Sequence, residues 1–198
     1  AFIEQAVGEG NCRGYVTPYG YSMEDYEDIL YDAGYVYYRG PNYTASNDRF
    51  AVPDTFYNWP VTMWFGGSDE QYALLQENMQ AFDTLEPTSE FKLFFMWGHS
   101  HDFGKGLADY TDPDDSDNDD YKTAESQAEA LTRLDEWCAY LEEHTDEIWN
   151  PTCLEYVDYV NAVRQLEITD EGNNNVKVVN PSESITCTVK IGDELYEI

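Results

Sequence analysis

The stretch Phe91-Lys92-Leu93-Phe94-Phe95-Met96-Trp97 runs directly into Gly98-His99-Ser100-His101-Asp102. A near-continuous apolar run of this length is typical of a strand that is buried on both faces, as in parallel sheets. Such strands occur in folds that alternate strands and helices, where the chemistry lies at the carboxyl ends of the strands. Two of the three histidines in the chain follow this predicted strand. The stretch therefore predicts an α/β fold with a hydrolase active site at this end.

The segments before this strand predict the same alternation. We expect residues 13–17 to form a strand, and a helix capped by Ser22 and Asp25 to follow and to end at Gly34. Residues 35–38 are expected to form the next strand. Residues 41–67, rich in Pro, Asn and aromatic residues, are expected to form a loop. The first helix should turn three apolar side chains inward: Tyr26, Ile29 and Leu30.

A second helix is predicted to begin at Ser68, with Gln71 completing a capping box. Its apolar residues recur at helical spacing: Tyr72, Leu75, Met79 and Phe82. A long third helix should place one apolar stripe inward: Leu131, Leu134, Cys138 and Leu141. Residues 148–149 are expected to form a short strand, and Thr152 and Glu155 to cap a final helix that runs to Gln165.

The last part of the chain changes character. Residues 176–179, 185–191 and 195–198 look like short strands, and Gly192-Asp193 suits a hairpin turn. We therefore expect a β/α body over residues 1–168 and a small antiparallel β appendage over residues 173–198. An acidic insertion at residues 104–122 is predicted to be a solvated loop, because no register supplies the ligands of a calcium loop.

The charge of the chain limits its partners. Forty acidic residues face ten basic ones, for a formal net charge of −30. Nucleic-acid binding and attachment to anionic membranes are therefore not expected, since both depend on Lys and Arg. No stretch approaches the roughly 20 apolar residues that span a bilayer, and the first residues lack signal-peptide features, so we expect a soluble protein of undetermined compartment. The four cysteines show no C-x-x-C spacing, which excludes zinc-ribbon and thioredoxin-type sites. Because three of them fall on predicted helices and an apolar strand face, we expect buried free thiols.

Two groups of residues are candidates for chemistry. On an extended backbone His99 and His101 would point to the same face, a spacing that can hold a metal with His144 or a nearby carboxylate such as Asp102. The same spacing can instead supply one catalytic acid–base and one orienting histidine. Arg13 can orient a carboxylate through its rigid fork, and a backbone N–H in the turn that follows it, Pro18-Tyr19-Gly20, can face a developing oxyanion.

Aromatic residues are frequent near the same strand ends: Tyr19, Tyr21, Phe56, Tyr57, Trp59 and Trp64. Flat aromatic faces suit sugar rings as well as core packing, so we assign two or three of them to a substrate groove.

With these segments in view, the chain resembles the polysaccharide deacetylases of the NodB-homology type (carbohydrate esterase family 4). The order and spacing agree over most of the chain in these stretches: residues 13–20, residues 50–59, Phe94-Phe95-Met96-Trp97-Gly98-His99-Ser100, Asp146-Glu147-Ile148-Trp149 with Glu155 and Tyr159, and Val179-Asn180-Pro181-Ser182. The resemblance implies a distorted (β/α)₇ barrel and metal-dependent hydrolysis, with zinc as the expected metal, of an acetyl group on a glycan.

The resemblance also implies roles for individual residues. His99 would assist the leaving group as general acid, Arg13 would steady the catalytic carboxylate, and Tyr19 would lend its backbone N–H to the oxyanion. Substrate-binding residues would be Pro18, Tyr19, Gly20, Trp59 and Trp97.

Two motifs that the family carries ahead of its arginine segment do not occur ahead of Arg13 in this sequence: an Asp-Asp pair that supplies the base and one metal ligand, and an H-x₃-H pair that supplies the others. The resemblance therefore covers roughly the C-terminal two-thirds of a deacetylase and implies a partial barrel. We expect this chain alone to bind no metal and to leave a sheet edge that a second copy or a further segment would complete. Two alternatives stay open: a non-catalytic glycan-binding or scaffold protein, and an unrelated metal hydrolase built on His99, His101 and Asp102.

Overall fold

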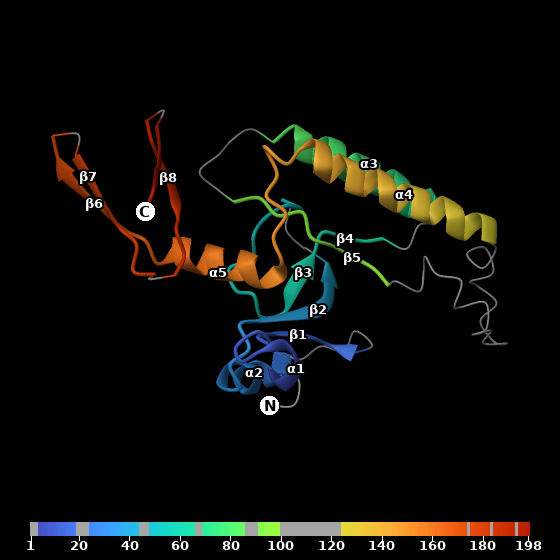
Figure 1. The fold of residues 1–198 in the computed structure, drawn as a ribbon, viewed down its shortest axis with the longest axis horizontal. Coiled ribbons are helices and arrows are strands. Elements are labelled where there is room, and N and C mark those ends of the chain that lie inside the picture. Colours follow the sequence, from blue (N-terminus) through green and yellow to red (C-terminus); the bar gives the residue numbers. More distant parts are fainter. Residues whose placement is uncertain are drawn as a thin grey trace. The chain divides into compact units, whose positions relative to one another are not determined.

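The computed structural model describes residues 4–18, 24–43, 48–65, 69–85, 91–99, 124–173, 175–182, 184–192 and 194–198. The chain divides into two compact units, and Figure 1 labels their helices and strands. The first unit comprises Ala1–Val16, Glu24–Tyr38 and Pro151–Ile198, and the second comprises Thr17–Met23 and Arg39–Asn150. The described helices and small sheets make a mixed α/β protein.

The first unit begins with short elements. They are the helix α1 (Glu4–Val7), the strand β1 (Gly14–Val16), a 3₁₀ turn (Glu24–Tyr26), the helix α2 (Glu27–Asp32) and the start of the strand β2 (Tyr37–Tyr43). The Val36 N–H donates to the Arg13 carbonyl at 2.7 Å, which confirms that the two predicted strands are neighbours. Gly34 has a φ of +86°, as the helix-ending role requires. The cap at Ser22 lies outside the described residues.

The inward face of α2 is narrower than the sequence predicts. Leu30 is buried, but the side chains of Tyr26 and Ile29 are 50% and 62% exposed. The prediction that all three point inward is therefore wrong. The α-helix proper has only six residues, and a helix this short presents one turn to its neighbours.

The helix α5 (Cys153–Arg164) matches its sequence signals closely. The Thr152 hydroxyl accepts from the Glu155 N–H, and the Glu155 carboxylate accepts from the Thr152 N–H, so the predicted capping box is confirmed. Gln165 is the C-cap residue, as expected. The buried face of the helix comprises Tyr156, Val157, Val160 and Ala162.

Two antiparallel hairpins follow α5. One consists of β6 (Glu167–Gly172) and β7 (Asn175–Val179), and the other of β8 (Thr188–Ile191) and β9 (Glu194–Glu197). An antiparallel β tail is thus confirmed, but it begins at Glu167 rather than at residue 173. The sequence did not predict β6, because every one of its residues is exposed and its apolar residues do not alternate with polar ones.

The second unit holds parallel strand pairs. The part of β2 from Arg39 onward pairs in parallel with β3 (Trp59–Val61), and β4 (Met63–Trp64) pairs in parallel with β5 (Met96–Trp97). Parallel pairing is therefore confirmed, while the expectation that residues 41–67 form only a loop is wrong.

The strand predicted at residues 91–97 is shorter than expected. Only Met96 and Trp97 lie in β5, and Lys92 makes an isolated antiparallel bridge to Ala51. The aromatic side chains between Lys92 and Met96 pack against other rings instead. Phe94, for example, contacts Phe50 at 5.8 Å and Trp137 at 4.9 Å between ring centroids.

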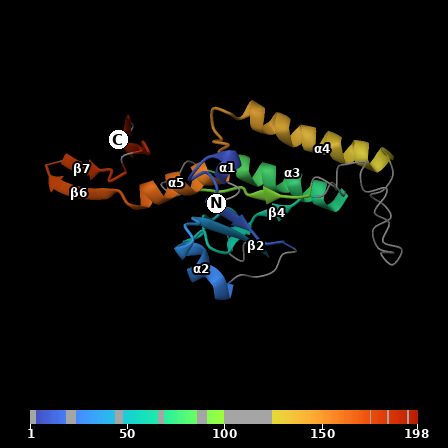
Figure 2. The same ribbon diagram turned by 60° about the horizontal axis from the view of Figure 1, so that its bottom comes forward.

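The helices α3 (Asp69–Asp83) and α4 (Ala124–Glu143) lie side by side in the second unit (Figures 1 and 2). Three buried residues form the centre of a core here: Met63, Phe65 and Leu75. Side chains from α3, α4, β5 and the segment before β5 pack against it: Tyr72, Met79, Phe94, Met96 and Trp137. Leu75 is thus buried as predicted for the apolar stripe of α3, and Tyr72 and Met79 border the same core.

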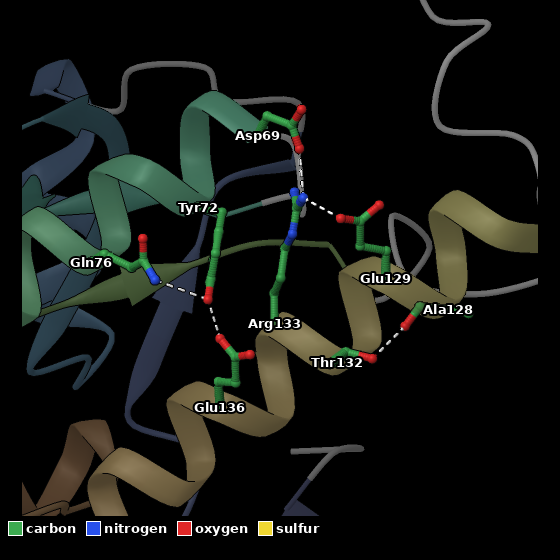
Figure 3. Close-up of polar contacts among 8 residues, drawn as sticks. All are labelled: Asp69, Tyr72, Gln76, Ala128, Glu129, Thr132, Arg133 and Glu136. Atoms are coloured by element: carbon green, nitrogen blue, oxygen red, sulfur yellow. Dashed lines mark hydrogen bonds and ion pairs between the residues drawn. The ribbon is translucent and has the colours of Figure 1, made fainter.

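The face that α4 buries differs from the predicted one. Leu131 and Cys138 are exposed, whereas Ala130, Arg133 and Tyr140 are buried. The buried residues of α4 lie one position before the predicted ones, because Arg133 lies inward. Its guanidinium lies over the Tyr72 ring, and its charge is paired with Asp69 and Glu129 (Figure 3). A paired arginine can line a buried face through its apolar stem, which an apolar pattern cannot reveal.

Two further expectations concern the whole architecture. Residues 148–149 form no strand; the Ile148 N–H donates to the His144 carbonyl at 2.7 Å, which prolongs the end of α4 as a turn. The barrel implied by the resemblance is not seen among the sheets of the described ranges and stays a prediction. None of the helices in the described ranges has the length and apolarity needed to cross a membrane.

Candidate functional site

His99 lies directly beyond the end of β5. The parallel register pairs Met63 with Met96 and Trp64 with Trp97, so β4 and β5 end at the same level. The Phe65 N–H then donates to the Trp97 carbonyl at 2.9 Å and holds the two strand ends together. His99 is therefore presented at the carboxyl end of a parallel pair, the position where α/β proteins place their chemistry.

Gly98 sets the path of the chain between β5 and His99. A Cβ at this position would lie 2.3 Å from the carbonyl oxygen of Phe65, a distance that real Cβ atoms do not adopt. Any other residue would push the two strand ends apart. The glycine thus permits the close approach that brings His99 next to β4.

The imidazole of His99 is exposed and meets the edge of Trp97, with 5.3 Å between ring centroids and an interplanar angle of 79°. Trp97 in turn lies 6.4 Å from Trp64 and carries the Arg39 guanidinium over its ring at 4.5 Å. An arginine over an indole is a favourable cation–π contact. Trp97 thus contacts both Trp64 and Arg39, and its ring is the surface against which the His99 imidazole lies.

The indole N–H groups of Trp64 and Trp97 are a second feature of this cluster. Both Nε1 atoms are buried and have no hydrogen-bond partner within the described ranges. Buried indole N–H groups usually find an acceptor. Because protein atoms cover both Nε1 atoms, these two donors do not face a ligand that binds over the exposed His99 ring.

Trp59 lies elsewhere in the second unit. Its side chain is 1% exposed and packs between the rings of Phe56 and Phe95, at centroid distances of 5.0 and 4.5 Å. The described role of Trp59 is core packing, and its place in a substrate groove stays a prediction. Pro18 is exposed, whereas Tyr19, Gly20, His101 and Asp102 lie outside the described residues.

Arg13 belongs to the first unit, where it forms a fork with Asp158. Arg13 Nη1 donates to one carboxylate oxygen at 3.1 Å and Nη2 to the other at 2.5 Å, while Nε donates to the Gly10 carbonyl at 3.0 Å. Hydrogen bonding to Asp158 raises the pKa of the Arg13 guanidinium. The predicted ability of Arg13 to orient a carboxylate is therefore realised on Asp158; its role toward a catalytic carboxylate stays a prediction.

The zinc centre that the resemblance implies needs several His, Cys, Asp or Glu side chains close together. Within the described ranges, no three His, Cys, Asp or Glu side chains are grouped so that they would hold a metal ion. His144 is engaged otherwise: its Nδ1 lies 2.8 Å from the Tyr140 carbonyl, and its Nε2 lies 3.9 Å from Asp83. The described residues thus do not fit the zinc centre that the resemblance implies. Cys187 is buried, Cys12 and Cys153 are half-buried and Cys138 is exposed, so the expectation that all four thiols are buried is wrong.

Two contacts, one within each unit, were not predicted. Arg39 contacts Trp97 across 58 positions of sequence, and Asp158 pairs with Arg13 across 145. Neither carries a local motif, because the contact exists only once distant segments meet. The sequence analysis did not single out Asp158. Its one local signal is a charge on α5 between two buried residues, Val157 and Val160.

Comparison of the chain with protein-family models, with curated proteins and with solved structures found no match in any of the three.

Proposed function

We propose that this protein is a hydrolase that removes acyl groups, such as acetyl, from a carbohydrate, with His99 as the general acid. The observation that carries the proposal is the position of His99: exposed, next to the end of a parallel strand pair, with its ring against Trp97. The resemblance of residues 94–100 to the corresponding segment of polysaccharide deacetylases assigns the same residue the same role.

The chemistry requires a proton donor at the leaving group. When water adds to the acyl carbonyl, the bond from carbon to the sugar nitrogen or oxygen breaks, and the departing atom must take up a proton. An imidazolium at His99 supplies that proton, and the neutral imidazole can later recover one from water. The exposure of the ring gives substrate access to it.

The neighbouring Trp97 ring serves orientation. It lies against the His99 imidazole, and Arg39 holds it in place. Because the described residues do not form a metal centre, no step of this proposal is assigned to a metal.

The test is acetate release from acetylated chito-oligosaccharides and acetylated xylan by the full chain, with and without added divalent metal. We expect release by the wild type, and a loss of about a hundredfold or more in His99→Ala. His144→Ala is the matched control, because it removes the other described histidine, and it should retain activity in proportion to its folded fraction.

The outcomes separate the candidates. Equal activity of His99→Ala and the wild type would overturn the role of His99. Absence of acetate release under every condition, with retained binding of the oligosaccharides, would replace the proposal by a glycan-binding protein without catalysis.

A further inference from the structure

The first unit contains a polar cavity of its own. It has a volume of about 340 Å³ and lies between α5, the segment before β8 and the Arg13 side chain. Its lining residues are Arg13, Asp158, Asn161, Ala162, Gln165, Ser182, Ser184 and Ile185. This volume is at the lower end of the range for small-molecule sites, which suits a ligand of one or two rings.

The cavity follows from the sequence of α5. Asp158, Asn161, Ala162 and Gln165 recur at helical spacing and share one face of the helix. A solvated helix face would also be polar at these positions. Here, however, Ala162 interrupts the face with a short side chain that is itself 5% exposed, and the hollow lies among its longer neighbours.

The walls of the cavity are fixed by contacts of their own. Arg13 is held by Asp158 and by the Gly10 carbonyl. The opposite wall is held by Asn180, whose side-chain amide donates to the carbonyls of Ile185 and Ile198 at 2.7 and 2.9 Å. The Ile185 N–H donates to the Ser182 hydroxyl at 3.1 Å. The cavity is therefore formed before any ligand arrives, which lowers the entropic cost of binding.

Several lining groups keep their hydrogen-bonding capacity. Within the described ranges, the side chains of Asn161, Gln165 and Ser184 make no hydrogen bond. The Arg13 guanidinium has five N–H groups, of which three are used in the contacts above. The cavity thus presents both donors and acceptors toward a small volume.

The charge of the lining selects the class of ligand. Arg13 and Asp158 neutralise each other, and the other lining residues are uncharged. With a formal net charge of −30 on the chain, an anion gains nothing from the surrounding field. A neutral ligand whose hydroxyl groups both donate and accept matches amides, hydroxyls and a paired arginine.

From these observations we infer that this cavity binds a neutral polyhydroxylated ligand, one sugar residue in size. The inference does not rest on the proposed hydrolysis, because Asn161, Gln165 and Ser184 take no part in that chemistry. A chain that fails to release acetate would still be tested for this binding.

The experiment follows the side-chain amide signals of Asn161 and Gln165 by nuclear magnetic resonance while the ¹⁵N-labelled full chain is titrated. The probes are glucose and N-acetylglucosamine, with glucuronate and glucosamine as charged comparators. We expect saturable shifts with the neutral sugars at millimolar concentration. Asn161→Ala should weaken binding about tenfold, the effect of one lost hydrogen bond, and Gln165→Ala should do the same.

Asn175→Ala is the matched control, because Asn175 is exposed on β7 and does not line the cavity. It should bind the sugars as the wild type does. Circular dichroism establishes whether each variant is folded. If Asn161→Ala does not fold, Gln165→Ala still tests the inference. Absence of saturable shifts, tighter binding of a charged comparator, or equal weakening by Asn175→Ala would each overturn the inference.

Discussion

The guanidinium of Arg133 lies 4.8 Å from the centre of the Tyr72 ring and joins α4 to α3 (Figure 3). The same group donates to Asp69 at 2.5 Å and to Glu129 at 2.7 Å, and the Tyr72 hydroxyl donates to Glu136. The Arg133 side chain is 10% exposed, whereas the carboxylates that pair with it face solvent. One cation therefore organises contacts from two helices.

We expect Arg133→Ala to lower the free energy of unfolding by about 2 kcal/mol, because it removes charge-assisted hydrogen bonds and a buried stem. Arg133→Met, which keeps most of the stem, should lose less. Urea denaturation measures both, with Asp135→Ala on the exposed side of α4 as control. An equal loss in the Met and Ala variants would show that packing of the stem contributes nothing.

Gly98 provides a prediction for the candidate site. Gly98→Ala places a Cβ against the Phe65 carbonyl, so the ends of β4 and β5 must separate. We expect a loss of about 1–3 kcal/mol in stability and a change in Trp fluorescence, since Trp64 and Trp97 flank the contact. A variant with unchanged stability and emission would contradict the close approach.

Alkaline pH should weaken the first unit through Tyr37. Burial, together with the nearby thiols of Cys153 and Cys12, raises the pKa of Tyr37 from 10.0 to about 12. The unfolded chain therefore ionises this phenol first, and the stability that Tyr37 contributes is lost as the pH rises from 10 to 12. Burial also raises the pKa of Tyr140 and of Tyr156.

Absorbance at the phenolate band and urea denaturation, each followed against pH, check this expectation. Tyr37→Phe should remove one late-ionising phenol and flatten part of the loss of stability above pH 10. A wild-type phenolate curve without any delayed component would contradict the burial of these rings.

The Arg13–Asp158 fork is suited to a double-mutant cycle. Its side chains are 34% and 29% exposed, so solvent screens the pair and we expect a coupling energy of about 1 kcal/mol. The cycle uses Arg13→Met, Asp158→Asn and the double variant, each measured by denaturation. Strictly additive effects would show that the fork contributes no energy beyond its separate residues.

Local signals in the sequence predicted the local structure well. The capping box of Thr152 and Glu155 and the glycine at the end of α2 act over a few residues, so the sequence alone specifies them. The apolar run before Gly98 correctly indicated a strand in a parallel pair, although most of that run lies outside β5, and its partner β4 falls in a segment that was expected to be a loop.

What the sequence did not reveal depends on distant partners. The inward side of α4 was wrong by one position because Arg133 is buried only where Asp69 and Tyr72 meet it. For the candidate site, His99 was placed at a strand end from its position alone, whereas Arg39 enters through a contact that no spacing rule describes. The polar strand β6 was missed because an exposed ribbon needs no apolar alternation.

The contact between Trp97 and His99 has an optical consequence. Because the two rings touch, a molecule that covers the exposed His99 imidazole also changes the surroundings of the Trp97 indole. The emission of Trp97 therefore reports occupancy of the candidate site without any label.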